Sequence, residues 1–191
     1  MADLHDGFGS QLVSAHMRAA AGTLPPEETA TLLKECLADL HLVIDTLRTE
    51  DGNLAHALGD YRYRLANRLA GTGVTLQWRV QLQQAPTLPG GTILQVLRVV
   101  QEALNNALKH AQAKVLTVEV TCPPGGPLYV AVSDDGVGVP ESVVGGKGLA
   151  FMKSRARAIG ATLEVKRRED GPGTKVTLAA PLPPPGAGRV A

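Results

Sequence analysis

Two β-strand patterns follow each other in this sequence with only a turn between them. Residues 115–120 and 129–133 are rich in β-branched side chains, and Pro123-Pro124-Gly125-Gly126-Pro127 separates them. Strands that succeed one another without a helix between them argue against a doubly wound parallel fold, in which a crossover helix follows each strand. The pair therefore predicts a sheet of mixed direction.

The surrounding patterns extend this prediction to a whole domain. Apolar residues spaced three and four apart predict helices, and alternating or β-branched runs predict strands. The expected helices cover residues 54–69, 93–111 and 149–159, and the further strands cover residues 74–80, 162–166 and 174–178. This order predicts an α/β sandwich with helices on one face of a mixed sheet.

A different pattern opens the chain. The apolar stripe Leu4, Phe8, Leu12, Ala15, Ala19 has helical spacing, and a second stripe from Leu33 to Leu47 repeats at close to 3.5 residues, as in a coiled coil or bundle. The segment Gly22–Pro26 breaks the helix between them. The two stripes predict an antiparallel helical hairpin, which packs either on the rest of the chain or on a second copy in a four-helix bundle.

Polar residues and a glycine interrupt the second stripe at Glu50-Asp51-Gly52-Asn53, which marks a domain boundary. We expect a hairpin over residues 1–50, an α/β domain over 51–180 and a disordered Pro/Gly-rich tail over 181–191. The predicted fold class is therefore α+β.

Composition excludes several classes of protein. The 191 residues carry 19 Lys and Arg against 18 Asp and Glu, so the broad basic surface of a duplex nucleic-acid-binding protein is absent. No apolar run reaches the ~18–20 residues that span a bilayer, and the first residues do not resemble a signal peptide. Cys36 and Cys122 lie far apart without metal-ligand spacing, as is typical of a reduced cytoplasmic protein.

Two glycine-containing segments flank secondary structure. Asp134-Asp135-Gly136-Val137-Gly138 follows a strand directly, and Gly145-Gly146-Lys147-Gly148 precedes a helix. Neither matches a Walker A loop or a complete Rossmann glycine fingerprint. A glycine-lined loop that ends at a helix N-terminus favours a phosphate, although each segment taken alone is more typical of a turn or a surface loop.

The helix expected over 93–111 carries an unusual group of polar residues. Glu102 and Asn106 lie four residues apart on one face, and Lys109 follows three residues later. One amide oxygen together with phosphates would suit Mg²⁺, which prefers oxygen ligands and keeps several waters. An ordinary solvated face is the alternative, but the Asn105-Asn106 pair is poor helix chemistry without a packing reason.

Taken together, these segments resemble the ATP-binding domain of the GHKL superfamily, which includes histidine kinases, gyrase-type ATPases, Hsp90 and the MutL proteins. The resemblance rests on Glu102 to His110, the Asp134-x-Gly136-x-Gly138 motif, Gly146-x-Gly148-Leu149 and Gly173-Thr174, in that order. It implies ATP and Mg²⁺ as ligands. Asn106 would then bind Mg²⁺, Glu102 would act on it through water, and Lys109 or His110 would contact phosphate oxygens.

The same resemblance implies the residues of the adenine end and of a lid. Asp134 would accept a hydrogen bond from the adenine amine, supported by Thr174, and Gly136 and Gly138 would let the backbone approach base and ribose. The implied lid residues are the hinge glycines Gly146 and Gly148 and the helix start at Leu149.

The first residues select one group within that superfamily. Leu4-His5-Asp6-Gly7-Phe8-Gly9 resembles the phosphoacceptor box of the sensor histidine kinases related to nitrate/nitrite sensors and to the membrane-fluidity thermosensor. His5 would accept phosphate from ATP, with Asp6 holding its tautomer, and pass it to an aspartate of a response regulator. Relatives with phosphatase activity have Gln where this chain has Ser10, which puts that activity in doubt.

This resemblance also implies a cytoplasmic kinase core that forms a homodimer and belongs to a longer sensor. Its partner would be a response regulator with a receiver and a helix-turn-helix output domain, and no direct contact with nucleic acid is expected. A membrane would be reached only through a sensor region outside this chain. The alternatives are a GHKL ATPase without a phosphorylated histidine, a serine-directed kinase, which would lack the hairpin, and a pseudokinase scaffold, which would lose Asn106 or the Asp134 motif.

Overall fold

The computed structural model describes residues 10–23, 25–48, 52–82, 86–139 and 146–182. The chain divides into two compact units, Met1–Asp45 and Thr46–Ala191. Within the described residues, no helix is long and apolar enough to cross a membrane.

The first unit is a helical hairpin. Helix α2 spans Ser10–Ala20, and helix α3 spans Pro26–Arg48 and continues past the end of the unit. Gly22, with φ of 67°, lies in the turn, where a residue with a side chain would be strained. Across the turn, both Nη atoms of Arg18 donate to the carboxylate of Glu28 at 2.7 and 2.8 Å. The predicted hairpin is therefore present over the residues that are described; Leu4 and Phe8 lie outside them.

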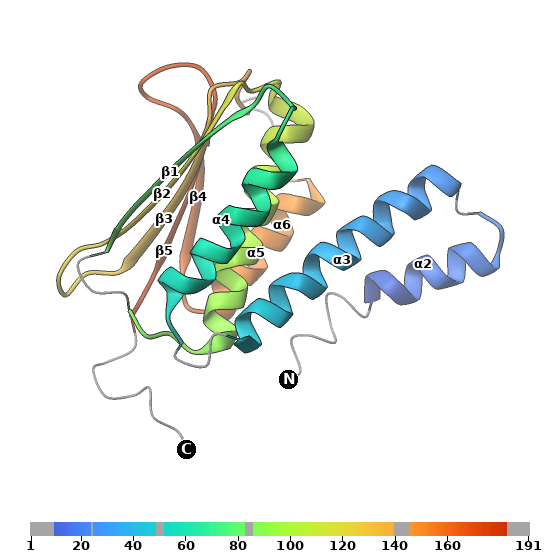
Figure 1. Cartoon of the computed structure of the whole chain (residues 1–191), viewed down its shortest axis with the longest axis horizontal. Coiled ribbons are helices and arrows are strands. Elements are labelled where there is room, and N and C mark those ends of the chain that lie inside the picture. Colours follow the sequence, from blue (N-terminus) through green and yellow to red (C-terminus); the bar gives the residue numbers. More distant parts are fainter. Residues whose placement is uncertain (1–9, 24, 49–51, 83–85, 140–145, 183–191) are drawn as a thin grey trace. The chain divides into compact units, whose positions relative to one another are not determined.

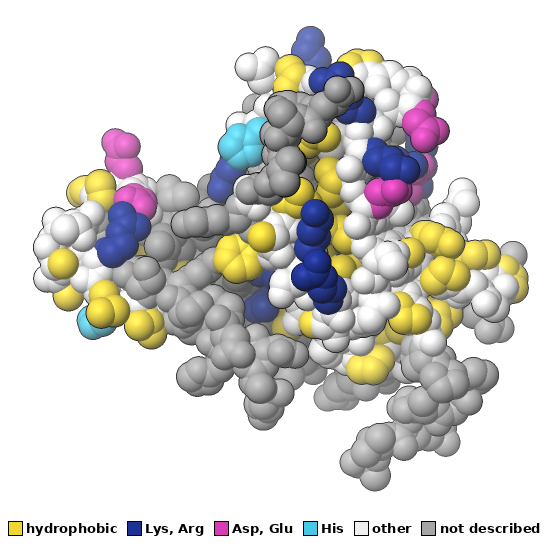
Figure 2. Space-filling view, turned by 180° about the vertical axis from the view of Figure 1, so that it is seen from behind, with side chains coloured by type: hydrophobic (Ala, Val, Ile, Leu, Met, Phe, Trp, Pro, Cys, Tyr) yellow, Lys and Arg dark blue, Asp and Glu magenta, His cyan; other side chains and the backbone are white. Residues whose placement is uncertain are grey.

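Apolar side chains of this unit lie at its surface, as the yellow atoms of Figure 2 show. On α2, Val13 and Met17 are 59% and 66% exposed. The exposed large apolar side chains of α3 are Leu33, Leu37, Leu40 and Ile44, each between 41% and 56% exposed. Their spacing of four, three and four residues forms one continuous stripe, which we call the α3 stripe.

The second unit is built on one five-stranded sheet with the strand order β1-β2-β3-β5-β4. Its strands are β1 (Thr75–Leu82), β2 (Val115–Cys122), β3 (Leu128–Asp134), β4 (Thr162–Arg167) and β5 (Thr174–Ala180). β1 and β2 are parallel, whereas the other neighbouring pairs are antiparallel. The prediction of a mixed sheet is confirmed.

Helices cover one face of this sheet (Figure 1). They are α4 (Leu54–Leu69), α5 (Gly90–Asn106), the π-helical turn η2 (Ala107–Ala111) and α6 (Lys147–Ala158). Four α5 side chains spaced four, three and four residues apart are fully buried, namely Ile93, Leu97, Val100 and Leu104. Alternate residues of β2, Leu116, Val118 and Val120, are fully buried as well. The core therefore lies between α5 and the middle of the sheet, and the sandwich prediction is confirmed.

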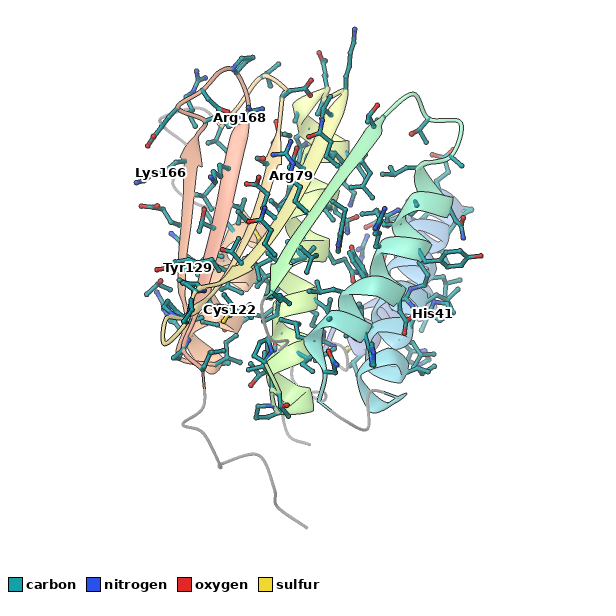
Figure 3. The ribbon with its side chains drawn as sticks, turned by 60° about the vertical axis from the view of Figure 1, so that its left-hand side comes forward. His41, Arg79, Cys122, Tyr129, Lys166 and Arg168 are labelled. Carbon is teal, nitrogen blue, oxygen red and sulfur yellow. The ribbon has the colours of Figure 1, made fainter. Side chains whose placement is uncertain are left out.

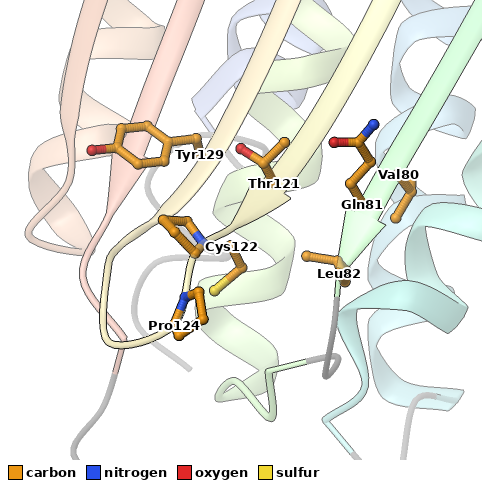
Figure 4. A pocket seen from close by; sticks show the side chains of 8 residues that line it. Val80, Gln81, Leu82, Thr121, Cys122, Pro124 and Tyr129 are labelled. Atoms are coloured by element: carbon orange, nitrogen blue, oxygen red, sulfur yellow. The ribbon is translucent and has the colours of Figure 1, made fainter.

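The other face of the sheet carries polar pairs. Arg79 of β1 donates to the carboxylate of Glu119 on the adjacent β2 at 3.0 Å (Figure 3). Beside the β2–β3 turn there is a pocket of about 620 Å³ (Figure 4), lined by Val80, Gln81, Leu82, Thr121, Cys122, Pro123, Pro124 and Tyr129. None of the predicted site residues lines this pocket among the residues that the structure describes, and Asp134 lies at the opposite end of β3.

Candidate functional site

Three polar residues of α5 that were singled out in the sequence, Glu102, Asn105 and Asn106, lie near its C-terminal end and are half-buried. Because the apolar residues of α5 face the core, Glu102, Asn105 and Asn106 lie on other faces of the helix. The two asparagines have different surroundings. Arg68 of α4 donates to the side-chain oxygen of Asn105 at 3.2 Å, which ties α4 to α5. Asn105 thus has a packing reason that the sequence did not reveal, whereas Asn106 is turned toward α6.

The first turn of α6 lies against Glu102 and Asn106. A Cβ at Gly148 would overlap the Glu102 carboxylate and would come within 3.4 Å of the Asn106 side-chain nitrogen. A side chain at position 148 would therefore require the Glu102 carboxylate, at the end of a flexible side chain, or the helix itself to move. The N-cap of α6 is Gly146, and no side chain in the described part of the chain caps this helix end. The N-terminus of α6 is thus held beside a carboxylate and an amide, with its first amides uncapped by side chains.

The end of β3 provides a buried carboxylate. The Asp134 side chain is only 5% exposed, and its Oδ1 accepts a hydrogen bond from the Gly136 amide at 2.9 Å. This bond folds the loop back on the strand. It occupies one carboxylate oxygen and fixes the orientation of the other.

The loop after Asp134 packs against the end of η2. The Val137 amide donates to the Ala111 carbonyl at 2.9 Å, and a Cβ at Gly136 would overlap that same carbonyl. The helix predicted to run unchanged to residue 111 instead widens into the π turn over its last five residues. It ends at Gln112 in the left-handed conformation, with φ of 52°. The π turn therefore determines where the Ala111 carbonyl meets the loop.

A second loop closes on Asp134 from β5. Gly173 has φ of 114°, and a Cβ there would overlap the Asp134 carbonyl. A Cβ at Gly138, which has φ of 77°, would lie 3.0 Å from the Gly173 carbonyl oxygen. Thr174 begins β5 directly after this contact and lies at the same end of the sheet as Asp134. Glycines that were expected to make room for a ligand thus also make room for neighbouring protein backbone.

Arg168 also contacts the backbone at Asp134. Its Nη1 lies 3.4 Å from the Asp134 carbonyl oxygen, and its Nη2 forms an ion pair with Asp170 at 2.8 Å. The hydrogen bond to Asp170 is the main cause of the raised pKa of Arg168, and the charges of Asp135 and Asp134 contribute. Figure 3 shows Arg168 at the end of the sheet away from Tyr129 and Cys122.

The structure thus brings the predicted residues into two groups. The first is Glu102, Asn106, Gly146, Gly148 and Leu149, and the second is Asp134, Gly136, Gly138 and Thr174. The π turn η2 connects them, with Lys109 and His110 exposed on its surface. His5 and Asp6 lie outside the described residues. Sequence reasoning missed Arg68, Ala111, Asp135 and Arg168, because their roles depend on partners 20 or more positions away.

Comparison with known proteins identifies this arrangement. Residues 91–184 match the family of histidine kinase-, DNA gyrase B- and HSP90-like ATPases. The chain is 34% identical to a NarQ homologue, a sensor protein of Haemophilus influenzae, over 78% of this chain and 25% of that protein. It is 32% identical to the sensor histidine kinase LnrJ of Bacillus subtilis over 73% of this chain and 34% of the relative. It is 28% identical to the nitrate/nitrite sensor NarX of Escherichia coli over 92% and 31%, respectively.

Solved structures agree on the fold. The histidine kinase domain of the blue-light activated histidine kinase from Erythrobacter litoralis EL346 superposes with a TM-score of 0.65 at 23% identity, covering 91% of this chain and 83% of that domain. The chain spans about a quarter to a third of the length of the curated relatives described above. It belongs to the sensor histidine kinases of the nitrate/nitrite-sensor branch, and residues 91–184 are its ATPase-family domain.

Proposed function

We propose that this chain is the kinase core of a two-component sensor. It binds ATP with Mg²⁺, transfers the γ-phosphoryl group to His5 and passes it to an aspartate of a separate response regulator. Family membership supports the reaction class, and the two residue groups joined by η2 support the location of the nucleotide site.

The observation that carries this proposal is the contact of Gly148 with Glu102 and Asn106. It brings a helix N-terminus, a carboxylate and an amide together from segments more than 40 positions apart. Phosphoryl transfer requires mainly positioning and neutralisation of charge, and these groups suit both requirements. A Cβ would fill this space, so glycine at position 148 keeps the approach of α6 open.

The residues present fit a magnesium–nucleotide complex. The Asn106 side chain offers an amide oxygen of the kind that Mg²⁺ binds, and the nearby Glu102 carboxylate suits an ion that retains its waters. Lys109 and His110, both exposed on η2, are placed to contact phosphate oxygens. Bound Mg²⁺ would supply neutralisation of the phosphate charge.

The adenine end of the site is the loop that follows β3. Asp134 is buried, and its Oδ1 is already held by the Gly136 amide, so its other oxygen is oriented in advance to accept the exocyclic amine. Guanine has a carbonyl at that position, which cannot donate. Thr174 supports this contact from the neighbouring β5.

His5 is the proposed phosphoacceptor. A ring nitrogen of its imidazole attacks the γ-phosphorus while the bond to the ADP oxygen breaks, and Asp6 accepts the other N–H. At neutral pH a substantial fraction of histidine is uncharged and nucleophilic, since its ordinary pKa is about 6.5. The phosphoryl group then passes to the response regulator, for which we propose a receiver and a helix-turn-helix output domain.

The α3 stripe supports a homodimer. Its four side chains are about half exposed, and two copies packed as a four-helix bundle would cover them. The assembly would place two phosphoacceptor helices side by side, as expected for a hairpin that both dimerises and accepts phosphate. We propose the hairpin over residues 1–50 and the ATP-binding domain over 51–180 as the two functional parts.

Labelling with [γ-³²P]ATP tests the proposal directly. The purified chain should gain label that is stable in alkali and lost in acid, and His5→Gln should abolish it. His41→Gln, at an exposed position on α3, is the matched control and should label normally. Alkali-labile label would indicate phosphorylation of serine, and ATP hydrolysis without label would indicate an ATPase of the same family. The absence of both label and hydrolysis would indicate a pseudokinase scaffold.

A further inference from the structure

The carboxylate of Asp135 joins two segments that the sequence keeps apart. Its Oδ1 accepts hydrogen bonds from the amides of Lys114 and Val115, each at 2.8 Å. The Asp135 amide in turn donates to the Val115 carbonyl at 3.3 Å. The loop after β3 is therefore clasped to the first residues of β2 by one side chain.

This clasp acts on the loop that holds the proposed adenine acceptor. Asp134 precedes Asp135 directly, and Val137, two residues later, bonds to the Ala111 carbonyl. The loop is thus fixed on both sides of Gly136, whose amide orients the Asp134 carboxylate. Residues 111–115 form the surface against which this orientation is set.

The charge of Asp135 suits this role. The hydrogen bond from Val115 is the main cause of a pKa of Asp135 below its ordinary value, and the bond from Lys114 and the attraction of Arg168 add to it. The side chain is therefore an anion at neutral pH. An ionised acceptor forms stronger hydrogen bonds to backbone amides than a neutral one does.

We propose that Asp135 is a positioning residue for nucleotide binding: it holds the loop at residues 134–138 so that Asp134 meets the adenine amine, without touching the nucleotide itself. This inference rests on the proposed ATP site. It goes beyond that proposal because it gives a role in nucleotide affinity to a side chain that, within the described residues, accepts its hydrogen bonds from the protein's own backbone.

Calorimetric titration of the whole chain with ADP and Mg²⁺ tests the inference. Asp135→Ala removes the acceptor and should raise the Kd for ADP about tenfold. Asp135→Asn keeps an oxygen that can accept both amides, and its Kd should stay within about twofold of the wild-type value. Glu119→Ala is the matched control. It also removes one carboxylate, but from the face of the sheet that the helices do not cover, and it should leave the Kd unchanged.

Amide exchange of the wild-type protein gives a measurement that does not depend on a stable variant. Because coupling between two sites is reciprocal, ADP should slow exchange at the amides of Lys114 and Val115. Three results would each overturn the inference. They are an unchanged Kd for Asp135→Ala, a Kd for Asp135→Asn as high as that of Asp135→Ala, and an exchange rate at these amides that ADP does not change. Wild-type protein that does not bind ADP would instead refute the nucleotide site itself.

Discussion

The carboxylate of Glu102 occupies the place that a side-chain carbon at Gly148 would need. The two residues lie on helices that are separate in the sequence, and their contact is one of several that hold α6 against α5. It also decides how close the N-terminus of α6 comes to Asn106.

Substituting Gly148 by Ala should displace the Glu102 carboxylate or the first turn of α6. Either movement changes the groups that are proposed to hold Mg²⁺ and the phosphates. We expect ATP affinity to fall about tenfold or more, measured by calorimetry. Gly59→Ala is the matched control, because Gly59 lies within α4 with open space around its Cα. That variant should gain about 0.4–1 kcal/mol of stability and bind ATP normally.

The neighbouring asparagines of α5 should respond differently to alanine. Asn106→Ala should abolish autophosphorylation, because it removes the proposed Mg²⁺ ligand, and should leave the fold intact. Asn105→Ala loses the bond from Arg68 and should lower the free energy of unfolding in urea by about 0.5–1.5 kcal/mol while His5 is still labelled. Normal labelling of Asn106→Ala at millimolar Mg²⁺ would refute the metal assignment.

Removing the Asp134 carboxylate should weaken nucleotide binding. A hydrogen bond to a charged acceptor contributes about 1.5–3 kcal/mol, which corresponds to a Kd for ADP about 10- to 150-fold higher in Asp134→Ala. Calorimetry measures this change, and circular dichroism checks that the variant is folded. If the affinity does not change, the Asp134 motif is only a turn.

The free energy of unfolding should depend on pH in the acid range because of the Asp135 carboxylate. Its pKa is lower in the folded protein, so its contribution is complete above the ordinary value near 3.9 and is lost as the pH falls through the folded value. The free energy of unfolding of Asp135→Asn should therefore fall less steeply than that of the wild type below about pH 4. Urea titrations between pH 2.5 and 7, chosen to span that range on both sides, compare the two slopes. Parallel curves would contradict the assignment.

Charges introduced into the α3 stripe should separate the dimer. Leu40→Asp combined with Ile44→Asp places two carboxylates in the proposed bundle seam, where they would be desolvated without partners. Analytical ultracentrifugation should show monomers that still bind ADP, with reduced labelling of His5 if transfer occurs between protomers. His41→Asp charges an exposed position on the same helix and should remain dimeric. A wild-type monomer at high micromolar concentration that still labels His5 would contradict the dimer proposal.

Strong periodic patterns explain why the order of elements could be read from the sequence. The helix predicted over 54–69 has the bounds of α4, and the strands around the Pro123–Pro127 turn pair as expected. The π turn escaped prediction because Ala107–Ala111 continues a helical composition, and its shape depends on the distant Val137 amide. In the same way, the sequence predicts that Gly136 belongs to a motif that needs glycine, but it does not show that Ala111 fills the space beside it.

The π turn also makes the geometry of the proposed site depend on the number of residues in η2. A π turn accommodates one residue more than an α-helical turn of the same span, so η2 sets the rotation of Ala111 about the helix axis relative to Asn106. The orientation of the proposed metal-binding helix relative to the proposed adenine-binding loop thus depends on the number of residues in η2. A relative that has gained or lost one residue in this stretch could keep every motif residue of the family. We would nevertheless expect it to lack catalytic activity.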